Sequence, residues 1–180
     1  MIATTSGRMP VGTWITAALL ALVALLGAGP GIANAAATTP AQSGWVDVTD
    51  APSGVTVALP GEADPVEVPF GRAYAPDGAD VAFAVVDVPT IPGLGLDTVL
   101  DSVGPGLGVT VVESQETTVD GRDALDAVVA VDREDAQGTA LVRAVLDDGH
   151  VIVLATRATD ASDETARALH QRLLAGLRFA

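Results

Sequence analysis

Hydrophobic and polar residues alternate along most of the chain beyond residue 44, a pattern typical of β-strands. The strongest example is the run 79–88, where Val81, Phe83 and Val85 share one face and the residues between them share the other. Alternation of this kind predicts strands over 45–48, 55–59, 65–74 (weakly), 79–88, 109–119, 122–132, 139–146 and 150–156.

Three Asp-Gly pairs separate these runs: Asp77-Gly78, Asp120-Gly121 and Asp148-Gly149. Asp-Gly between alternating runs favours a tight turn, because both residues tolerate the left-handed backbone that such a turn needs. We therefore expect an antiparallel meander.

One short helix is predicted inside the chain. Residues 96–103 carry apolar side chains at positions i, i+3, i+4 and i+7, and the pattern stops at Gly104-Pro105.

A second helix is predicted at the C-terminus. Asp160 or Ser162 is expected to cap it, with Asp163 and Glu164 in its first turn. Arginines near its end suit the negative end of the helix dipole. The expected apolar stripe consists of Ala166, Leu169, Leu173 and Leu177.

The strands at 140–146 and 151–155 are apolar at nearly every position, which indicates strands covered on both faces. The two amphipathic helices would supply the covers. The predicted fold class is α+β, an antiparallel sheet in a three-layer α/β/α sandwich.

This order of elements resembles the PsbP-like family of exported bacterial domains. The resemblance rests on an aromatic before a strand that ends in a proline turn (Trp45 and 55–60), the turn-flanked pattern at 119–124, the strand pair at 143–155, and the closing Leu-Arg-Phe at 177–179. It implies an α-β-α sandwich and a role in binding or assembly without catalysis. The chain departs from the family in its few aromatics and its lack of a lipoprotein cysteine, and no functional residue carries over.

The N-terminus predicts export. Residues 14–26 are apolar, yet the run is shorter than the ~20 residues that span a bilayer. Glycines and a proline follow, and Ala33-Asn34-Ala35 fits a signal peptidase site. We expect a signal peptide at 1–35, a flexible spacer at 36–44 and one α+β domain at 45–180, with a retained anchor as the alternative. The mature protein would be secreted or associated with the cell envelope, without stable membrane insertion.

Composition narrows the possible functions. The formal net charge is −14, which disfavours binding to nucleic acid. The chain has no cysteine, which excludes disulfides, thiolate nucleophiles and Cys-ligated metals.

Candidate chemistry is sparse. No G-x-S-x-G motif is present, and His150 and His170 are the two histidines. His150 follows a turn and is expected to be exposed. His170 lies at the edge of the helical stripe, so we expect a partly buried ring against the sheet with one nitrogen bonded to a backbone carbonyl; contact with a ligand is the alternative.

Two further patterns involve aspartates and glycines. Asp120, Asp123 and Asp126 recur every third residue, but alternation along a strand turns Asp123 away from the other two, so solvated carboxylates are expected. The glycine-rich segments 92–95 and 104–108 flank the short helix and could act as hinges beside a pocket. The candidate ligand-contacting or partner-contacting residues are therefore His170, Gly93, Gly95 and Gly106.

These observations favour an exported, non-enzymatic domain that binds a protein partner or a small ligand, with no cofactor and no metal. Two alternatives stay open. One is a metal-assisted hydrolase with Asp and His ligands. The other is a carrier of a small apolar ligand, with a cavity between the short helix and the sheet.

Overall fold

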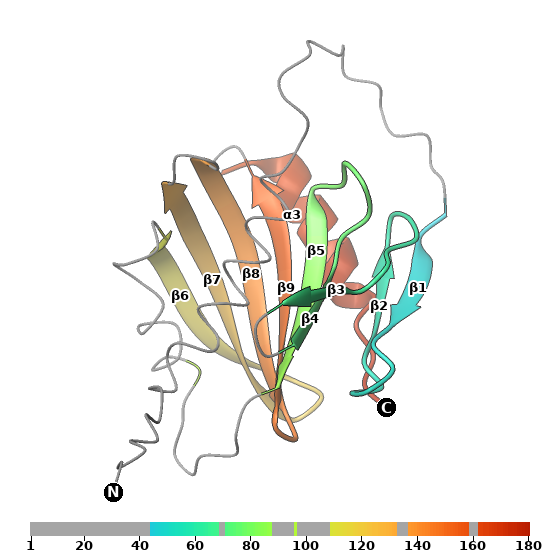
Figure 1. The fold of residues 1–180 in the computed structure, drawn as a ribbon. Helices are drawn as coiled ribbons and strands as arrows, with labels where there is room; N and C mark the ends of the chain where they lie inside the picture. The colour runs from blue at the N-terminus through green and yellow to red at the C-terminus, as the bar shows by residue number, and fades with distance from the viewer. Residues whose placement is uncertain (1–43, 69–70, 88–95, 97–108, 133–136, 159–161) are drawn as a thin grey trace, which may run out of the picture.

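The computed structural model describes residues 44–68, 71–87, 96, 109–132, 137–158 and 162–180. Within them, a seven-stranded antiparallel sheet has the strand order β3-β4-β5-β9-β8-β7-β6, beside a two-stranded sheet of β1 and β2 (Figure 1). The strands are β1 (Val46–Thr49), β2 (Thr56–Leu59), β3 (Val66–Val68), β4 (Gly71–Tyr74), β5 (Val81–Asp87), β6 (Val109–Val119), β7 (Arg122–Asp132), β8 (Gln137–Asp147) and β9 (His150–Ala158).

The predicted meander is confirmed. Asp120 and Gly121 both have positive φ, as do Asp148 and Gly149, so two-residue turns join β6 to β7 and β8 to β9. Asp77-Gly78 lies in a longer connection between β4 and β5, which also pair antiparallel. The order departs from a simple meander at one place, where β5 pairs along its whole length with β9.

The large sheet has two apolar faces. Phe83, Ile152 and Leu154 belong to the face that packs against the C-terminal helix, which we call the helix face. The opposite face consists mainly of alanine and valine from the same strands, including Ala84 and Val153. Both faces of β5 and β9 are buried, which is why these strands carry almost no polar residues.

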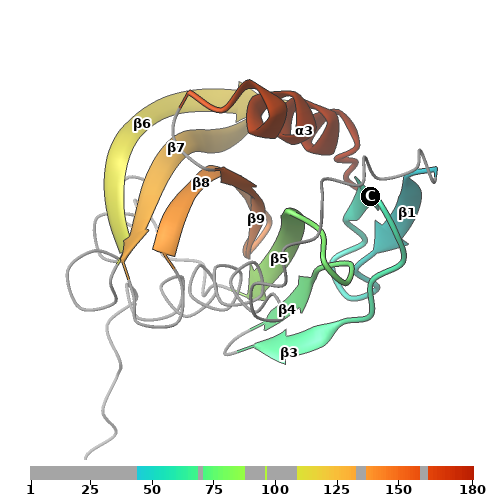
Figure 2. The ribbon, with the colours of Figure 1, turned by 90° about the horizontal axis from the view of Figure 1, so that it is seen from above.

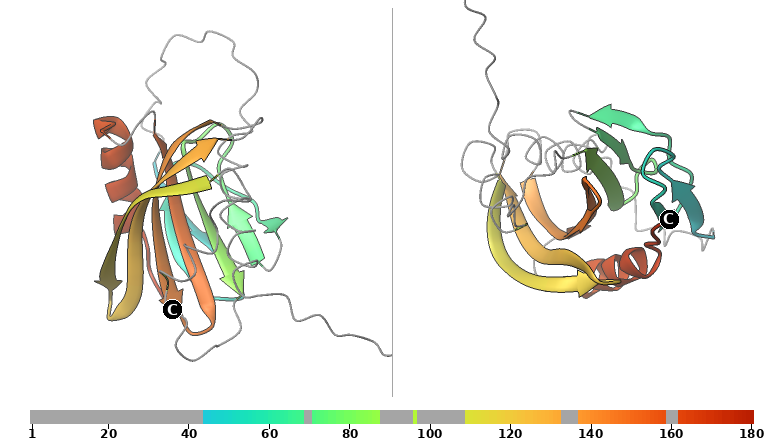
Figure 3. Two further views of the ribbon diagram at one scale, coloured as in Figure 1. Left: turned by 90° about the vertical axis from the view of Figure 1, so that its left-hand side faces the viewer. Right: turned by 90° about the horizontal axis from the view of Figure 1, so that it is seen from below.

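The C-terminal helix α3 (Glu164–Ala175) lies against one face of the sheet (Figures 2 and 3). Its N-cap is Asp163, whose Oδ1 accepts a hydrogen bond from the backbone N–H of Ala166 at 3.0 Å. The expected cap at Asp160 or Ser162 is therefore wrong. Asp163 takes that role because its extended backbone places its carboxylate on a free N–H of the first turn.

The end of α3 is held against β2. Gly176 ends the helix, and a Cβ atom there would lie 2.6 Å from the Cβ of Ala58, so only glycine allows this approach. Just beyond, Thr56 and Arg178 exchange two backbone hydrogen bonds of 2.9 and 2.8 Å. The tail thus adds to the small sheet and fixes the position of the helix.

The second predicted cover lies largely outside the described residues. Of the expected helix at 96–103, Leu96 is described; it is helical, buried, and packs on the opposite face. The structure therefore shows an antiparallel α+β fold with one C-terminal helix, and the sandwich remains a prediction. Residues 1–43, which include the predicted signal peptide and nearly all of the spacer, also lie outside it.

No helix in the described ranges is long and apolar enough to cross a membrane.

A candidate binding groove beside the C-terminal helix

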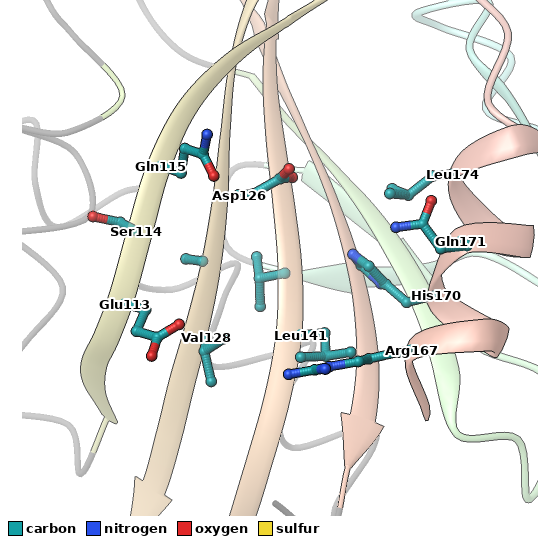
Figure 4. A pocket seen from close by; sticks show the side chains of 12 residues that line it. Glu113, Ser114, Gln115, Asp126, Val128, Leu141, Arg167, His170, Gln171 and Leu174 are labelled. Atoms are coloured by element: carbon teal, nitrogen blue, oxygen red, sulfur yellow. The ribbon is translucent and has the colours of Figure 1, made fainter. Parts of the chain in front are cut away.

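A groove of about 550 Å³ runs between α3 and strands β6, β7 and β8 on the helix face (Figure 4). It exists because α3 packs chiefly on β9, at the centre of the sheet, and leaves the helix face of β6 and β7 beside it. Its lining consists of Glu113, Ser114, Gln115, Asp126, Ala127, Val128, Leu141, Val142, Arg167, His170, Gln171 and Leu174.

A β-bulge shapes the wall formed by β6. The pairing with β7 shifts between Val111 and Glu113, so that Val111 lies opposite Val129 and Glu113 lies opposite Val128. Val129 belongs to the opposite face, whereas Val128 lines the groove. The extra residue, Val112, thus changes which positions of β6 face α3, and beyond it Glu113 and Gln115 do so (Figure 4). The sequence predicted an uninterrupted strand here and missed this change of face.

An ion pair crosses from β7 to β8 at one end of the groove. Arg143 donates hydrogen bonds from Nε and from one terminal nitrogen to the two carboxylate oxygens of Asp126, each at 2.6 Å. Such a two-point bond fixes both side chains and neutralises their charges. Asp126 is therefore a rigid part of the wall.

His170 projects from α3 toward the strands, and its side chain is well buried, with 7% exposure. Its Nδ1 lies 3.0 Å from Oγ1 of Thr156 on β9. The expected burial against the sheet is confirmed, but the expected backbone carbonyl partner is wrong. The hydroxyl of Thr156 takes the place of the backbone carbonyl, because Thr156 is buried on β9 directly beneath the helix.

The other ring nitrogen of His170 faces the groove. Every buried side-chain nitrogen and oxygen of the described residues has a hydrogen-bond partner. Nε2 of His170 has no partner among these residues, so it is not a buried atom and reaches the groove surface. Burial lowers the pKa of His170 to about 4; nearby Asp126 raises it and Arg143 lowers it further, by smaller amounts. The imidazole is therefore neutral at neutral pH.

The described fold is similar to that of solved proteins. Cyanobacterial PsbP (CyanoP) from Synechocystis sp. PCC 6803 matches with a TM-score of 0.54 at 14% sequence identity, over 82% of this chain and 99% of that one. The chain has a PsbP-like fold. PA94 from Pseudomonas aeruginosa, a protein of unknown function, matches with a TM-score of 0.40 at 11% identity, over 71% of this chain and 94% of PA94.

The PsbP-like fold confirms the resemblance that the sequence indicated. A scan of the sequence against protein-family models gives no match, and no curated protein matches it. At this low identity the similarity shows the fold alone, so the function has to be argued from the groove.

The predicted site residues are distributed unevenly on this PsbP-like fold. His170 lines the groove, while Gly93, Gly95 and Gly106 lie outside the described residues. Asp120 and Asp123 are exposed, as expected. Asp126 was wrongly grouped with them, because the cross-strand register places Arg143 beside it.

His150 is half-buried, with its Nδ1 3.0 Å from Oδ1 of Asp87 on β5. The prediction of a simply exposed residue is therefore wrong, because β5 lies next to β9 and brings a carboxylate to the turn.

Sequence reasoning missed five polar residues of the lining. Glu113, Ser114 and Gln115 lie on β6, and Arg167 and Gln171 lie one turn apart on α3. The polarity of β6 was a usable signal, since a strand so polar lies at a sheet edge or beside water. No group of three metal-binding side chains is found among the described residues.

Outside the groove, the buried carboxylate of Asp50 is held by hydrogen bonds within the chain. The carboxylate of Asp50 is 0% exposed and accepts hydrogen bonds from Arg72, Tyr74 and Ser53. Burial raises the pKa of Asp50, but these bonds outweigh it and bring the pKa to about 2. This network ties the β1–β2 turn to β4 and has a structural role.

Proposed function

We propose that this protein is an exported, non-enzymatic binding module, and that the groove beside α3 holds a small ligand or a side chain of a partner protein. The observation that carries the proposal is Nε2 of His170, a polar atom on a well-buried ring that faces an open groove and has no hydrogen-bond partner among the described residues. Because Nε2 is the accessible atom of an otherwise buried ring, a polar group in the groove can bond to it in place of water.

Size and lining support a binding role. Ligand sites measure ~300–1,000 Å³ and combine apolar walls with a few oriented polar groups, and this groove of about 550 Å³ does both. The side chain of Ser114, a hydroxyl of the lining, points away from His170 in Figure 4, which does not suit a nucleophile activated by that imidazole.

Export is proposed from the N-terminal pattern. An apolar run over 14–26 followed by Ala33-Asn34-Ala35 is typical of a cleaved signal peptide. Protein recovered from the host envelope is expected to begin at Ala36, and an intact Met1 terminus would indicate a retained anchor or no export.

Site-specific photo-cross-linking in the host envelope tests the binding role. A photoreactive residue in place of Gln171, in the groove, is expected to capture a ligand or partner, whereas one in place of Ala168, exposed elsewhere on α3, is not. Val128→Trp should fill the groove and abolish capture, with circular dichroism as the check on folding. Equal capture from both positions would exclude the groove as the binding site.

The hydrolase alternative makes a separate prediction. A catalytic metal would be near stoichiometric in protein purified from the host and would survive dialysis, which metal analysis measures directly.

A further inference from the structure

The edge strand β6 is long and open. One edge of the seven-stranded sheet is β3, with three residues, and the other is β6, with eleven. In the described part of the chain β6 pairs with β7 alone, and Figure 2 shows it as the outermost strand on its side of the sheet. An edge of this kind presents a row of backbone N–H and C=O groups onto which another strand can add.

The register with β7 determines which backbone groups of β6 point outward. Val119 and Arg122 flank a two-residue turn, so they form the hydrogen-bonded pair that closes the hairpin. Hydrogen-bonded and non-hydrogen-bonded positions alternate along an antiparallel strand. Gln115 therefore bonds to β7, whereas the N–H and C=O groups of Ser114 and Glu116 point to the open edge.

The composition of β6 leaves this edge accessible. The strand contains neither proline nor lysine, two residues that commonly protect an edge. Its side chains from Glu113 to Glu116 are exposed, as is that of Val112, at 57%. The bulge at Val112 interrupts the edge near one end and leaves residues 113–119 in regular register. The features that limit the choice of partner are the two carboxylates, of Glu113 and Glu116.

The sequence of β6 is self-complementary about Gln115. A second copy can run antiparallel to it with Gln115 opposite Gln115, where the two side-chain amides can bond to each other. Ser114 then lies opposite Glu116, which also joins their outward backbone groups, and Glu113 lies opposite Thr117. Each carboxylate thus meets a hydroxyl that can donate to it, and no like charges lie opposite each other. A pair centred on Glu116 would instead set two carboxylates against each other.

Charge and size indicate how strong the pairing is. Each copy carries a formal net charge of −14, so long-range repulsion opposes association, and salt screens it beyond ~8 Å at physiological ionic strength. A basic partner strand would behave in the opposite way, because salt weakens an attraction between opposite charges. An interface of one strand pair lies at the small end of the range for protein complexes, so we expect the pairing to depend on protein concentration.

We propose that this protein forms a two-fold dimer through β6, with Gln115 at the axis and the two seven-stranded sheets joined into one. A two-fold dimer uses the same patch on both copies, which the self-complementary strand provides. The axis is perpendicular to the sheet, so both α3 helices lie on the same side. Because Glu113 and Gln115 also line the groove, the two grooves adjoin at the interface. The dimer goes beyond the proposed binding function and does not depend on it.

Disulfide cross-linking is a direct test, because the chain has no cysteine of its own. In Gln115→Cys the two new residues form a non-hydrogen-bonded pair, whose Cα atoms lie ~4.5 Å apart, within the range of a disulfide. In Glu113→Cys the two new residues are four positions apart along the strands, about 13 Å. Mild oxidation is expected to give a covalent dimer of Gln115→Cys on a non-reducing gel, and little of Glu113→Cys. Equal cross-linking of the two variants, or none of Gln115→Cys, would overturn the proposal.

Sedimentation velocity measures the dimer without a cross-link. The wild-type protein is expected to pass from monomer to dimer as its concentration rises, and to do so at lower concentration when salt is added. Gln115→Glu should weaken the dimer by about threefold or more, because it opposes two carboxylates at the axis. Thr118→Glu adds the same charge to the same strand, but opposite Val112, and should weaken the dimer less.

Three results of this experiment would contradict the dimer: a protein that stays monomeric at millimolar concentration, a dimer that salt dissociates, or equal effects of the two glutamate variants. Circular dichroism checks that each variant is folded. Failure of the dimer would leave the photo-cross-linking test of the groove unaffected, since that test compares Gln171 with Ala168 on α3.

Discussion

Nδ1 of His170 on helix α3 lies 3.0 Å from the hydroxyl of Thr156 on strand β9. Both residues are buried, and this bond joins the helix to the centre of the sheet. It also sets the orientation of the imidazole, so that Nε2 faces the groove. The packing of α3 and the proposed binding site thus involve the same side chain.

Thr156→Val should destabilise the protein, because it leaves Nδ1 buried without a partner. An unsatisfied buried polar group costs ~1–3 kcal/mol, and we expect a loss of about 1–2 kcal/mol in the free energy of unfolding. Urea denaturation measures it. Thr118→Val, at an exposed position of β6, is the control and should change little. Equal stability of the two variants would contradict the importance of the bond.

Stability should fall as the pH drops from about 6.5 toward 4. The pKa of His170 is about 4 in the folded protein and near 6.5 in the unfolded chain, so the unfolded state binds more protons in this window. The stabilisation is complete above pH 6.5 and decreases toward pH 4. Each unit of pKa difference corresponds to ~1.4 kcal/mol, so the total effect amounts to a few kcal/mol.

The measurement is the free energy of unfolding at several pH values for the wild type and for His170→Gln. The variant should show a shallower decrease between pH 6.5 and 4. Identical slopes would mean that the histidine titrates normally in the folded state.

Asp50→Asn should destabilise the fold by about 2–3 kcal/mol. Asp50 is fully buried and accepts bonds from Arg72 and Tyr74, and removal of its charge leaves the guanidinium without its carboxylate. Breaking a buried pair costs ~3–5 kcal/mol, reduced here because Arg72 is 15% exposed. Thermal or urea unfolding is the test. Asp47→Asn serves as the control and should change the stability less, because the carboxylate of Asp47 is exposed.

The same carboxylate predicts a second, more acidic transition. Hydrogen bonds lower the folded pKa of Asp50 from 3.8 to about 2, so its contribution is present above pH ~4 and is lost as the pH falls toward 2. This window lies below that of His170. Asp50→Asn should make the decrease in stability between pH 4 and 2 shallower and leave the one between 6.5 and 4 in place.

Gly176→Ala should destabilise the junction between α3 and β2. The new Cβ would lie 2.6 Å from the Cβ of Ala58, so the helix end must shift, and such overpacking costs ~1–3 kcal/mol. Ala58→Gly in the same molecule should restore part of the stability, since it removes the nearest atom but leaves the backbone N and Cα of residue 58 at 3.0 and 3.2 Å. Gly44→Ala is the control, because no atom lies within 4 Å of the added group. A failure of Ala58→Gly to rescue would show that the backbone of Gly176 matters more than the contact.

The alternation of apolar residues and the Asp-Gly pairs determined the strands and turns, because both signals depend only on residues that are close together in the sequence. The runs predicted at 109–119 and 122–132 have the same bounds as β6 and β7. The prediction failed where several residues of suitable type compete for one contact. At the N-cap of α3, Asp160, Ser162 and Asp163 all suit the role by residue type, and the structure places Asp163 there.

The groove was decided by the tertiary structure alone. Its lining comes from the consecutive strands β6, β7 and β8 and from α3, which follows them in the sequence only after β9. His170 was identified from its place on the helical stripe, but its partner Thr156 depends on where α3 crosses the sheet. Asp126 and Arg143 are brought together by the register of β7 and β8, and Glu113 reaches the groove through the bulge at Val112. Local pattern fixes which way a side chain points on its own strand or helix, whereas the packing of distant segments fixes what it meets there.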